Sequence, residues 1–214
     1  MDAKPYDIIT EADARVLAPG TTVRLARHGH VTPLAADTLR ARRITVVRED
    51  GVPNATAAAL APVADIRRLV VGCDHTGVAL KKRIVDWCRG RGLAVVEAGA
   101  ADATPVDYPD VAASVAQPVA RGEADAGIVI DGAGLGSAIA ANKVRGIRAA
   151  MITDETIARY SREHNGTNVM TLGSTLLPDN QTAIRLVDVW LGTPMTEARY
   201  IRRLWKIRRM EESF

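Results

Sequence analysis

From residue 69 onward, short apolar runs alternate with longer amphipathic stretches. The runs are typical of buried strands, and the stretches between them predict helices. Strands that are apolar throughout and alternate with helices indicate a parallel sheet covered on both faces. The predicted strands are 69–73, 93–96, 126–130, 147–152 and 168–172, and the predicted helices are 77–91, 109–121, 155–163, 179–191 and one that begins near Met195.

The first 66 residues follow a different pattern, with less regular apolar spacing and several prolines. Helices are predicted near 10–13 and 33–39, strands at 21–25 and 44–47, and an Ala-rich linker at 55–62. We therefore expect an α/β fold. A Rossmann-like three-layer sandwich with a five-stranded parallel sheet is expected over 67–214, after a small α+β module over 1–66.

The composition is that of an ordinary globular protein, with 47% hydrophobic and 25% charged residues and a net charge of +3. No apolar run is long enough to span a bilayer and the N-terminus has no apolar signal region, so we expect a cytoplasmic protein without a membrane partner. Cys73 and Cys88 are expected to be free thiols. The basic residues between 199 and 209 lack interleaved aromatics, so no nucleic-acid partner is expected.

Polar residues follow several of the predicted elements. Asp74 and His75 come after the first of these strands, Asp131 after the third, and segments 107–110 and 163–165 lie in later connections. A single Asp after a strand is usually a helix cap. Four such connections together favour a ligand site, because open parallel sheets bind ligands beyond the carboxyl ends of their strands. We expect the four to converge.

The third strand runs directly into Asp131 and a loop with glycine at every second position, Gly132, Gly134 and Gly136 (132–136, the Gly loop). An acid beside exposed backbone N–H groups suits both proton transfer and anion binding. The spacing is not Gly-x-Gly-x-x-Gly and does not follow the first strand of the sheet, which argues against a dinucleotide. No Gly-Lys-Ser/Thr follows, so a Walker loop is excluded.

Several motifs resemble, in order and spacing, those of the ribose-5-phosphate isomerase B family, which includes the galactose-6-phosphate isomerase subunits. The resemblance covers about residues 68–210. The matching segments are Gly72-Cys73-Asp74-His75-Thr76-Gly77, Asp107-Tyr108-Pro109-Asp110, the Gly loop, 140–148, Arg162-Glu163-His164-Asn165 and Arg199-x-x-x-Arg203.

The resemblance implies interconversion of an aldose phosphate and a ketose phosphate through an enediolate, without metal or cofactor. The N–H groups of the Gly loop would stabilise the oxyanion. His164 and Asn165 would assist ring opening and hydroxyl recognition. The resemblance also implies contacts to substrate from Asp74 on sugar hydroxyls, from His75, Arg199 and Arg203 on phosphate, and from Tyr108 and Ser137.

The chain departs from the family at the base. The family often has a cysteine where Asp131 stands, and a second branch has a glutamate just after the Gly loop, where this chain has Ser137. Asp131 is the expected base, and the competing interpretation is that it only caps the loop. Ala133 replaces a common Thr or Ser, and Thr175 stands where many members have an arginine. Ribose 5-phosphate, a tetrose, another pentose or a branched sugar phosphate all remain open as substrates.

Members of the family are homodimers or tetramers with the active site across the subunit interface, which we expect here too. The alternative is a catalytically silent sugar-phosphate-binding or assembly protein in which residues 1–66 carry the main function. The segment 31–46 faintly resembles modules attached to bacterial microcompartment proteins. His28 and His30 are expected to be surface residues rather than metal ligands.

Overall fold

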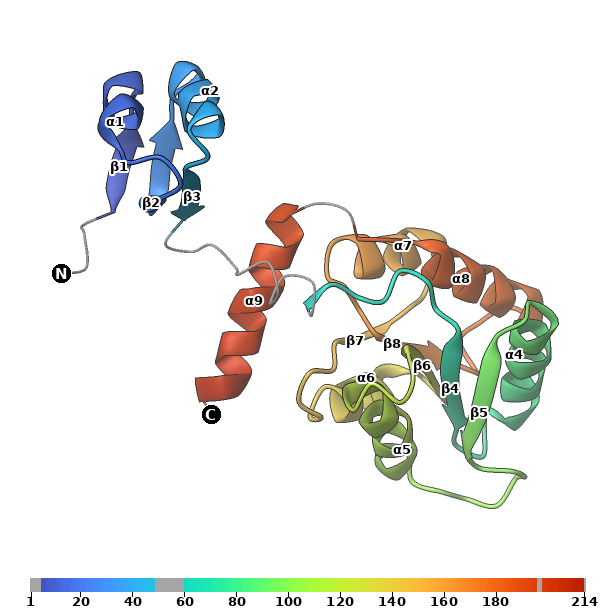
Figure 1. The fold of residues 1–214 in the computed structure, drawn as a ribbon. Coiled ribbons are helices and arrows are strands. Elements are labelled where there is room, and N and C mark those ends of the chain that lie inside the picture. Colours follow the sequence, from blue (N-terminus) through green and yellow to red (C-terminus); the bar gives the residue numbers. More distant parts are fainter. Residues whose placement is uncertain (1–4, 49–59, 196–197, 214) are drawn as a thin grey trace. The chain divides into compact units, whose positions relative to one another are not determined.

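The computed structural model describes residues 5–48, 60–195 and 198–213, without the side chains of 27, 28, 48, 198, 199 and 213. The chain divides into two compact units, residues 1–54 and 55–214, each considered below by itself. Figure 1 labels the elements of both. No helix in the described ranges combines the length and the hydropathy that crossing a membrane requires.

The N-terminal unit is a three-stranded parallel sheet with strand order β1-β2-β3 and two helices. Its elements are β1 (Tyr6–Ile9), α1 (Glu11–Val16), β2 (Thr22–Val31), α2 (Pro33–Ala41) and β3 (Thr45–Arg48). Thr10 and Asp13 form a capping box that begins α1, and Thr32 caps α2 just before Pro33. The small core consists of Ile9, Ala14, Val23, Leu25, Ala35, Leu39 and Ile44.

Two features of this unit differ from the prediction. β1 was not predicted, because its four residues include Asp7 and are too few to show an alternating pattern. β2 continues beyond the predicted end at Leu25 to Val31. The extension pairs with β1 at His30 and Val31, so tertiary pairing rather than local hydrophobicity determines its length.

The second unit contains a five-stranded, fully parallel sheet with strand order β5-β4-β6-β8-β7. This confirms the predicted sheet. Its strands are β4 (Arg68–Cys73), β5 (Ala94–Gly99), β6 (Ala126–Asp131), β7 (Ala149–Met151) and β8 (Val169–Gly173). The helices are α4 (Val78–Gly90), α5 (Tyr108–Ala120), α6 (Leu135–Ala141), α7 (Glu155–Glu163), α8 (Asn180–Gly192) and α9 (Ala198–Ser213).

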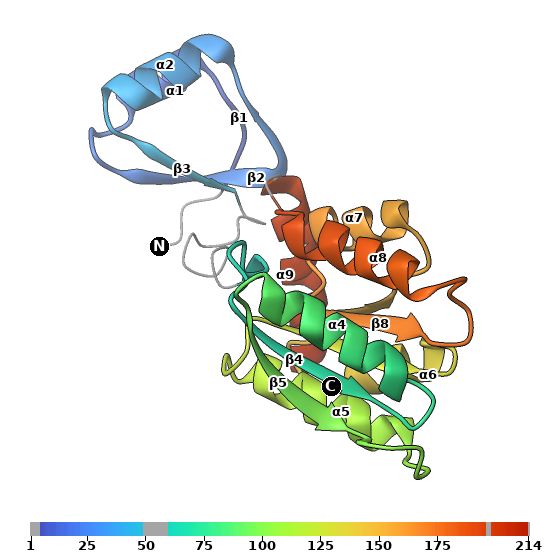
Figure 2. The same cartoon turned by 90° about the vertical axis from the view of Figure 1, so that its right-hand side faces the viewer.

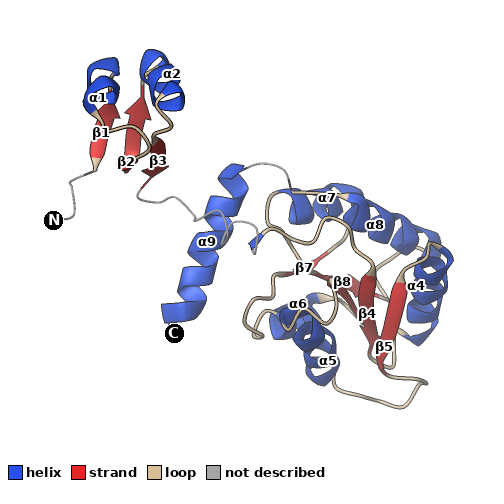
Figure 3. Ribbon diagram, viewed as in Figure 1, coloured by secondary structure: helices blue, strands red, loops and turns tan. Residues whose placement is uncertain are grey.

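Helices cover both faces of this sheet, as Figures 2 and 3 show. On one face α4, α7 and α8 pack on Val71, Ile128 and Met170, and on the other α5 and α6 pack on Val70 and Val129. β4, β6 and β8 are therefore buried on both sides, which explains why they are apolar throughout. The three-layer sandwich is confirmed.

The segment that precedes β4 belongs to this second unit and packs on its other elements. Leu60 and Ile66 are buried, although the predicted linker and module include them. The buried Arg162 guanidinium donates to the Val63 carbonyl at 2.8 Å, and Arg148 donates to the Leu60 carbonyl at 3.2 Å. The boundary between the two compact units accordingly falls at 54/55 rather than at 66/67.

Candidate functional site at the carboxyl edge of the sheet

Three connections meet where β4, β6 and β8 end, which we call the carboxyl edge. Asp74 follows β4, and its Oδ1 accepts the N–H and hydroxyl of Thr76 at 2.8 and 2.6 Å. The Thr76 hydroxyl lies 3.1 Å from that of Ser174, which follows β8. Ser174 N–H donates to the Asp131 carbonyl at 2.7 Å. These bonds fix the three loops to one another, as the binding rule for parallel sheets predicts.

Close packing explains two of the glycines in the Gly loop. Gly134 has φ +80°, and a Cβ there would lie 3.0 Å from the backbone nitrogen of Gly173. A Cβ on Gly136 would lie 2.6 Å from the ring of Tyr108, which is thereby placed against the loop. At Gly132, by contrast, the nearest atom to an added Cβ is the Thr76 hydroxyl at 3.9 Å. The loop is tightly held at its helix end and open at its strand end.

The Asp131 carboxylate is hydrogen-bonded within its own loop. Oδ1 accepts the N–H groups of Ala133, at 2.9 Å, and of Gly134. Oδ2 accepts the N–H of Ser137 at 3.0 Å and also the Ser137 hydroxyl. A carboxylate offers about four lone-pair positions, and these four donors occupy them. Asp131 is 4% exposed. The sequence raised a cap of the loop as the competing role of Asp131, but it did not identify these four donors.

Other donors of the Gly loop remain available. Among the described residues, no partner is present for the N–H groups of Gly132, Leu135 and Gly136. The first N–H groups of a helix carry partial positive charge and bind anions. An oxygen that develops negative charge at this edge therefore has backbone donors besides those that Asp131 occupies.

The two cysteines do not replace the thiol of the resembling family. Cys73 ends β4 and is fully buried, and burial raises the pKa of its thiol. Burial also raises the pKa of the Cys88 thiol, to about 11. Since the thiolate is the reactive form, both side chains are inert at neutral pH.

His164 and Asn165 do not join this site within one chain, contrary to the predicted convergence of four connections. α7 runs back from the carboxyl edge, so its C-terminal residues lie before β8. Asp131 pairs in register with Gly173, and β8 begins four residues earlier at Val169. At about 3.3 Å per residue, His164 is displaced from Asp131 by more than about 13 Å along the strands. It lies at the opposite, amino edge.

At this amino edge, His164 lies among aromatic side chains. The ring centroids of Tyr160 and Tyr200 are 4.4 and 4.5 Å from that of His164, with interplanar angles of 22° and 31°. The Arg203 guanidinium lies 5.5 Å from the Tyr200 ring centre. Arg199 is one helical turn before Arg203 on α9, but its side chain is outside the described part.

The remaining predicted residues lie at the carboxyl edge. His75 follows Asp74 directly, and its Nδ1 is buried without a hydrogen-bond partner in the described structure. Thr175 donates its hydroxyl to the Gly132 carbonyl at 2.6 Å, so it supports the Gly loop. Sequence reasoning gave no role to Thr76, although it lies within a matching motif, and missed Ser174, for which the position after a strand is the only signal.

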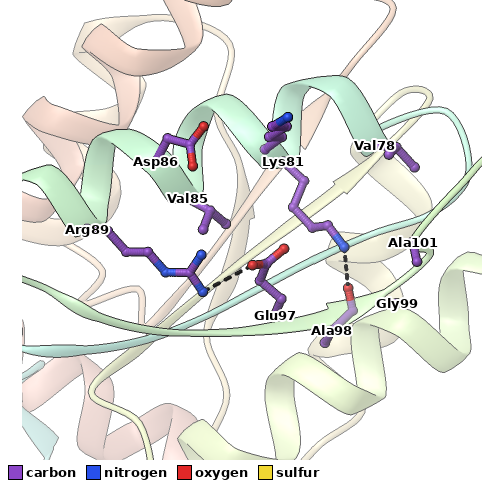
Figure 4. A pocket seen from close by; sticks show the side chains of 10 residues that line it. Val78, Lys81, Val85, Asp86, Arg89, Glu97, Ala98, Gly99 and Ala101 are labelled. Atoms are coloured by element: carbon purple, nitrogen blue, oxygen red, sulfur yellow. Dashed lines mark hydrogen bonds and ion pairs between the residues drawn. The ribbon is translucent and has the colours of Figure 1, made fainter.

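A separate cavity of about 480 Å³ lies between α4 and the edge strand β5 (Figure 4). Three of its charged groups already have partners. Lys81 donates to the carbonyls of Ala98 and Ala100 at 3.2 and 2.7 Å, and Arg89 pairs with Glu97 at 3.1 Å. His, Cys, Asp and Glu form no group of three that could hold a metal ion in the part of the chain described. The carboxyl edge is thus the better candidate site.

Known proteins resemble the second unit. The family model described as Ribose/Galactose Isomerase matches residues 69–207. Ribose-5-phosphate isomerase B of Escherichia coli is 40% identical over 147 residues, which cover 69% of this chain and 98% of that protein. The Clostridium thermocellum ribose-5-phosphate isomerase B structure is 43% identical with TM-score 0.67, over 68% and 98% of the two chains. The Mycoplasma genitalium enzyme with bound ribulose-5-phosphate is 36% identical with TM-score 0.66, over 69% and 97%.

Proposed function

Since the chain belongs to the ribose/galactose isomerase family, we propose that it isomerises a phosphorylated aldose to the ketose, and the reverse, through an enediolate. The observation that carries this proposal is the carboxyl edge, where the open N–H groups of the Gly loop lie beside the carboxylates of Asp131 and Asp74. Aldose–ketose conversion moves one proton between neighbouring carbons while negative charge develops on oxygen. A base and a set of fixed donors are the groups that this reaction needs.

Asp131 is the proposed base, and its hydrogen bonds define how it would act. Three of its four donors are backbone N–H groups that cannot turn away. The Ser137 hydroxyl is the fourth and can rotate about its Cα–Cβ bond. Rotation of that hydroxyl frees one lone pair on Oδ2 for a substrate proton. Ser137 then controls access of the substrate proton to Oδ2 of Asp131, and we call its hydroxyl the gate. It does not replace the family's glutamate.

The same network supports a second candidate function. A carboxylate with four donors is already satisfied, so Asp131 has a sufficient role as the cap of the Gly loop. In that case the protein binds sugar phosphates without turning them over, and the N-terminal unit carries the main function. That unit lies outside the family match. For it we retain the proposal of an assembly module, with a bacterial microcompartment as the place of assembly.

We further propose that a second copy of the chain completes each site. His164 and Asn165 lie at the amino edge, beyond the reach of a sugar phosphate held at the Gly loop of the same chain. In a homodimer, or a pair of dimers, they would come from the partner together with Arg199 and Arg203. Leu135 and Ile139, which are 59% and 64% exposed and one turn apart on α6, offer apolar surface for this contact.

The groups that would hold the two ends of a sugar phosphate bear on which substrate fits the site. Thr175 uses its hydroxyl on the Gly loop and brings no cation to the carboxyl edge. We propose that His75, Arg199 and Arg203 hold the phosphate, as the resemblance to the family implies. Ala133 supplies no hydroxyl near the reacting carbons. Tetrose, pentose and branched sugar phosphates are all within this class, and a panel of them is the direct test.

The test compares two variants in deuterated water. The wild type is expected to convert a member of the panel and to place solvent deuterium on the carbon next to the carbonyl. Ser137→Ala removes the gate and keeps the three N–H donors, so turnover is expected to stay the same or rise if Asp131 is the base. Asp131→Asn is expected to lower turnover by orders of magnitude.

The two candidates give different results. Saturable binding of sugar phosphates by the wild type, with no turnover and no deuterium, would establish the silent binder. Turnover by the wild type that persists in Asp131→Asn would remove Asp131 as the base and leave the isomerase. Sedimentation of the wild type as a monomer while active would contradict the shared site.

A further inference from the structure

The imidazole of His164 is held between two tyrosine rings. The centroids of both rings lie about 4.5 Å from that of the imidazole, one ring stacked at 22° and the other tilted at 31°. Two rings this close would overlap if they shared a face, so Tyr160 and Tyr200 cover its two faces. Tyr160 comes from the turn before His164 on α7, and Tyr200 comes from α9. Tyr200 is buried and Tyr160 is about half exposed. Only the edge of the imidazole is left to meet a ligand, and there its Nε2 lies 3.7 Å from the Glu163 carboxylate.

Such an arrangement restricts the motion that matters for proton transfer. An imidazole ring can turn about its Cβ–Cγ bond through a broad range of angles. Two stacked rings resist this turn, because it would drive the imidazole edge into either tyrosine. The imidazole plane is therefore fixed before the substrate arrives, and preorganisation of this kind is worth much in catalysis, where misplacement by about 1 Å can cost about 100-fold.

We propose that Tyr160 and Tyr200 are positioning residues that hold the His164 imidazole in the orientation required to open the ring of a cyclic sugar phosphate. This inference rests on the proposed function. In ring opening, a proton leaves the hydroxyl on C1 and another reaches the ring oxygen as the bond between C1 and that oxygen breaks. The products are an aldehyde and a free hydroxyl, with no net gain or loss of protons.

Tyr200 has a second contact, to a side chain that is proposed to bind the other end of the substrate. Its ring lies 5.5 Å from the Arg203 guanidinium, a distance at which a cation is attracted to an aromatic face. One side chain thus contacts both the ring-opening imidazole and a proposed phosphate-binding cation. Tyr200 fixes the distance between these two groups, so it sets the length of sugar phosphate that fits.

Two substrates separate ring opening from isomerisation. A pentose 5-phosphate closes a furanose ring through its 4-hydroxyl and must be opened. A tetrose 4-phosphate carries its phosphate on that oxygen, so it has no such ring. The full-length variants Tyr160→Leu and Tyr200→Leu are expected to lose about 10- to 100-fold in kcat on the pentose and to stay within about twofold of the wild type on the tetrose.

Three further measurements strengthen the comparison. Tyr200→Phe keeps the ring and is expected to retain wild-type kcat, whereas Tyr200→Leu is expected to raise KM on both substrates because Arg203 loses its neighbour. Trp205→Leu on the same helix, which removes a ring stacked on Arg209 at 4.9 Å, is the control and should change neither constant. In the Leu variants, the rate on the pentose should also level off as enzyme is added, because spontaneous ring opening then limits it.

The outcomes distinguish the inference from the function on which it rests. Equal losses on both substrates in the Leu variants, or a pentose rate that keeps rising with enzyme, would overturn the positioning role while leaving the isomerase. If the wild type turns over the pentose but not the tetrose, the two substrates cannot be compared. The positioning role is then tested only by whether the pentose rate of the Leu variants levels off as enzyme is added. No turnover of any sugar phosphate by the wild type would overturn the proposed function and this role together. Thermal unfolding of each variant checks for a folding defect. Tyr160→Leu should disturb the fold less than Tyr200→Leu, because Tyr160 is half exposed.

Discussion

Replacement of Asp131 by asparagine is expected to destabilise the second unit as well as to affect turnover. Asparagine has the same shape but only one acceptor oxygen, and its amide group presents two donors on the other side. In the structure, each oxygen of Asp131 accepts two donors. Whichever way the amide is turned, two donors of the Gly loop or Ser137 would face its N–H groups.

The magnitude follows from these bonds. A hydrogen bond to a charged group contributes about 1.5–3 kcal/mol to stability, so the loss of two lowers the free energy of unfolding by about 3–6 kcal/mol. If the amide nitrogen faces Ser137, its hydroxyl can turn to accept from that nitrogen, which offsets about 1 kcal/mol. The remainder is a large fraction of the stability of an ordinary domain, about 5–15 kcal/mol.

Urea unfolding followed by circular dichroism measures this loss. Asp154→Asn is the matched control, because Asp154 caps α7 through a bond to the N–H of Ile157 at 2.9 Å and asparagine caps equally well. That variant should lie within about 0.5 kcal/mol of the wild type. A loss below about 1 kcal/mol in Asp131→Asn would refute the four-donor network. If the loss of stability is large, lost turnover in Asp131→Asn could come from damage to the Gly loop. The turnover of Ser137→Ala is then needed as well before Asp131 is assigned as the base.

Three other predictions concern the packing of the second unit. Gly136→Ala should lower kcat/KM at least tenfold with little change in thermal stability, since its Cβ would displace the half-exposed Tyr108 ring; unchanged kinetics would mean that Tyr108 does not contact substrate. Burial raises the pKa of the Cys88 thiol from 9 to about 11, so the contribution of this side chain to the free energy of unfolding is fully present below about pH 9. That contribution, about 2–3 kcal/mol, should disappear as pH rises through 11, seen as a convergence of wild-type and Cys88→Ala urea midpoints. Arg162→Leu should lower the free energy of unfolding by about 2–4 kcal/mol, because the Val63 carbonyl and a second buried carbonyl lose their donor; equal or greater stability would show that burial of the guanidinium costs more than these bonds contribute.

The larger sheet was predictable from sequence because its strands are buried on both faces. Apolar runs such as 126–130 reflect that burial directly. β1 was missed because it is short and includes Asp7, and the extension of β2 depends on its pairing with β1. Local patterns contain no information on such pairing.

The site was predictable in its residues but not in its geometry. Motif spacing drew attention to Asp131, Asp74 and His164, yet it left open whether Asp131 acts as a base or caps its own loop. Motif spacing also could not reveal that His164 lies at the amino edge of the sheet. Two motifs of one family can lie at opposite ends of the same strand. Tyr160 and Tyr200 belong to no motif. Tyr160 contacts His164 within α7, whereas the contact of Tyr200 forms only when α9 packs near α7.

The separation of Asp131 and His164 by the length of β8 has a genetic consequence in the proposed dimer. Each site would take its Gly loop from one copy and its imidazole from the other. A variant damaged at Gly136 and another damaged at His164 would both be inactive alone. Refolded together, they would form mixed dimers in which one site carries both lesions and the other carries neither. Two dead alleles would then complement each other, and at equal dose about a quarter of all sites would be intact.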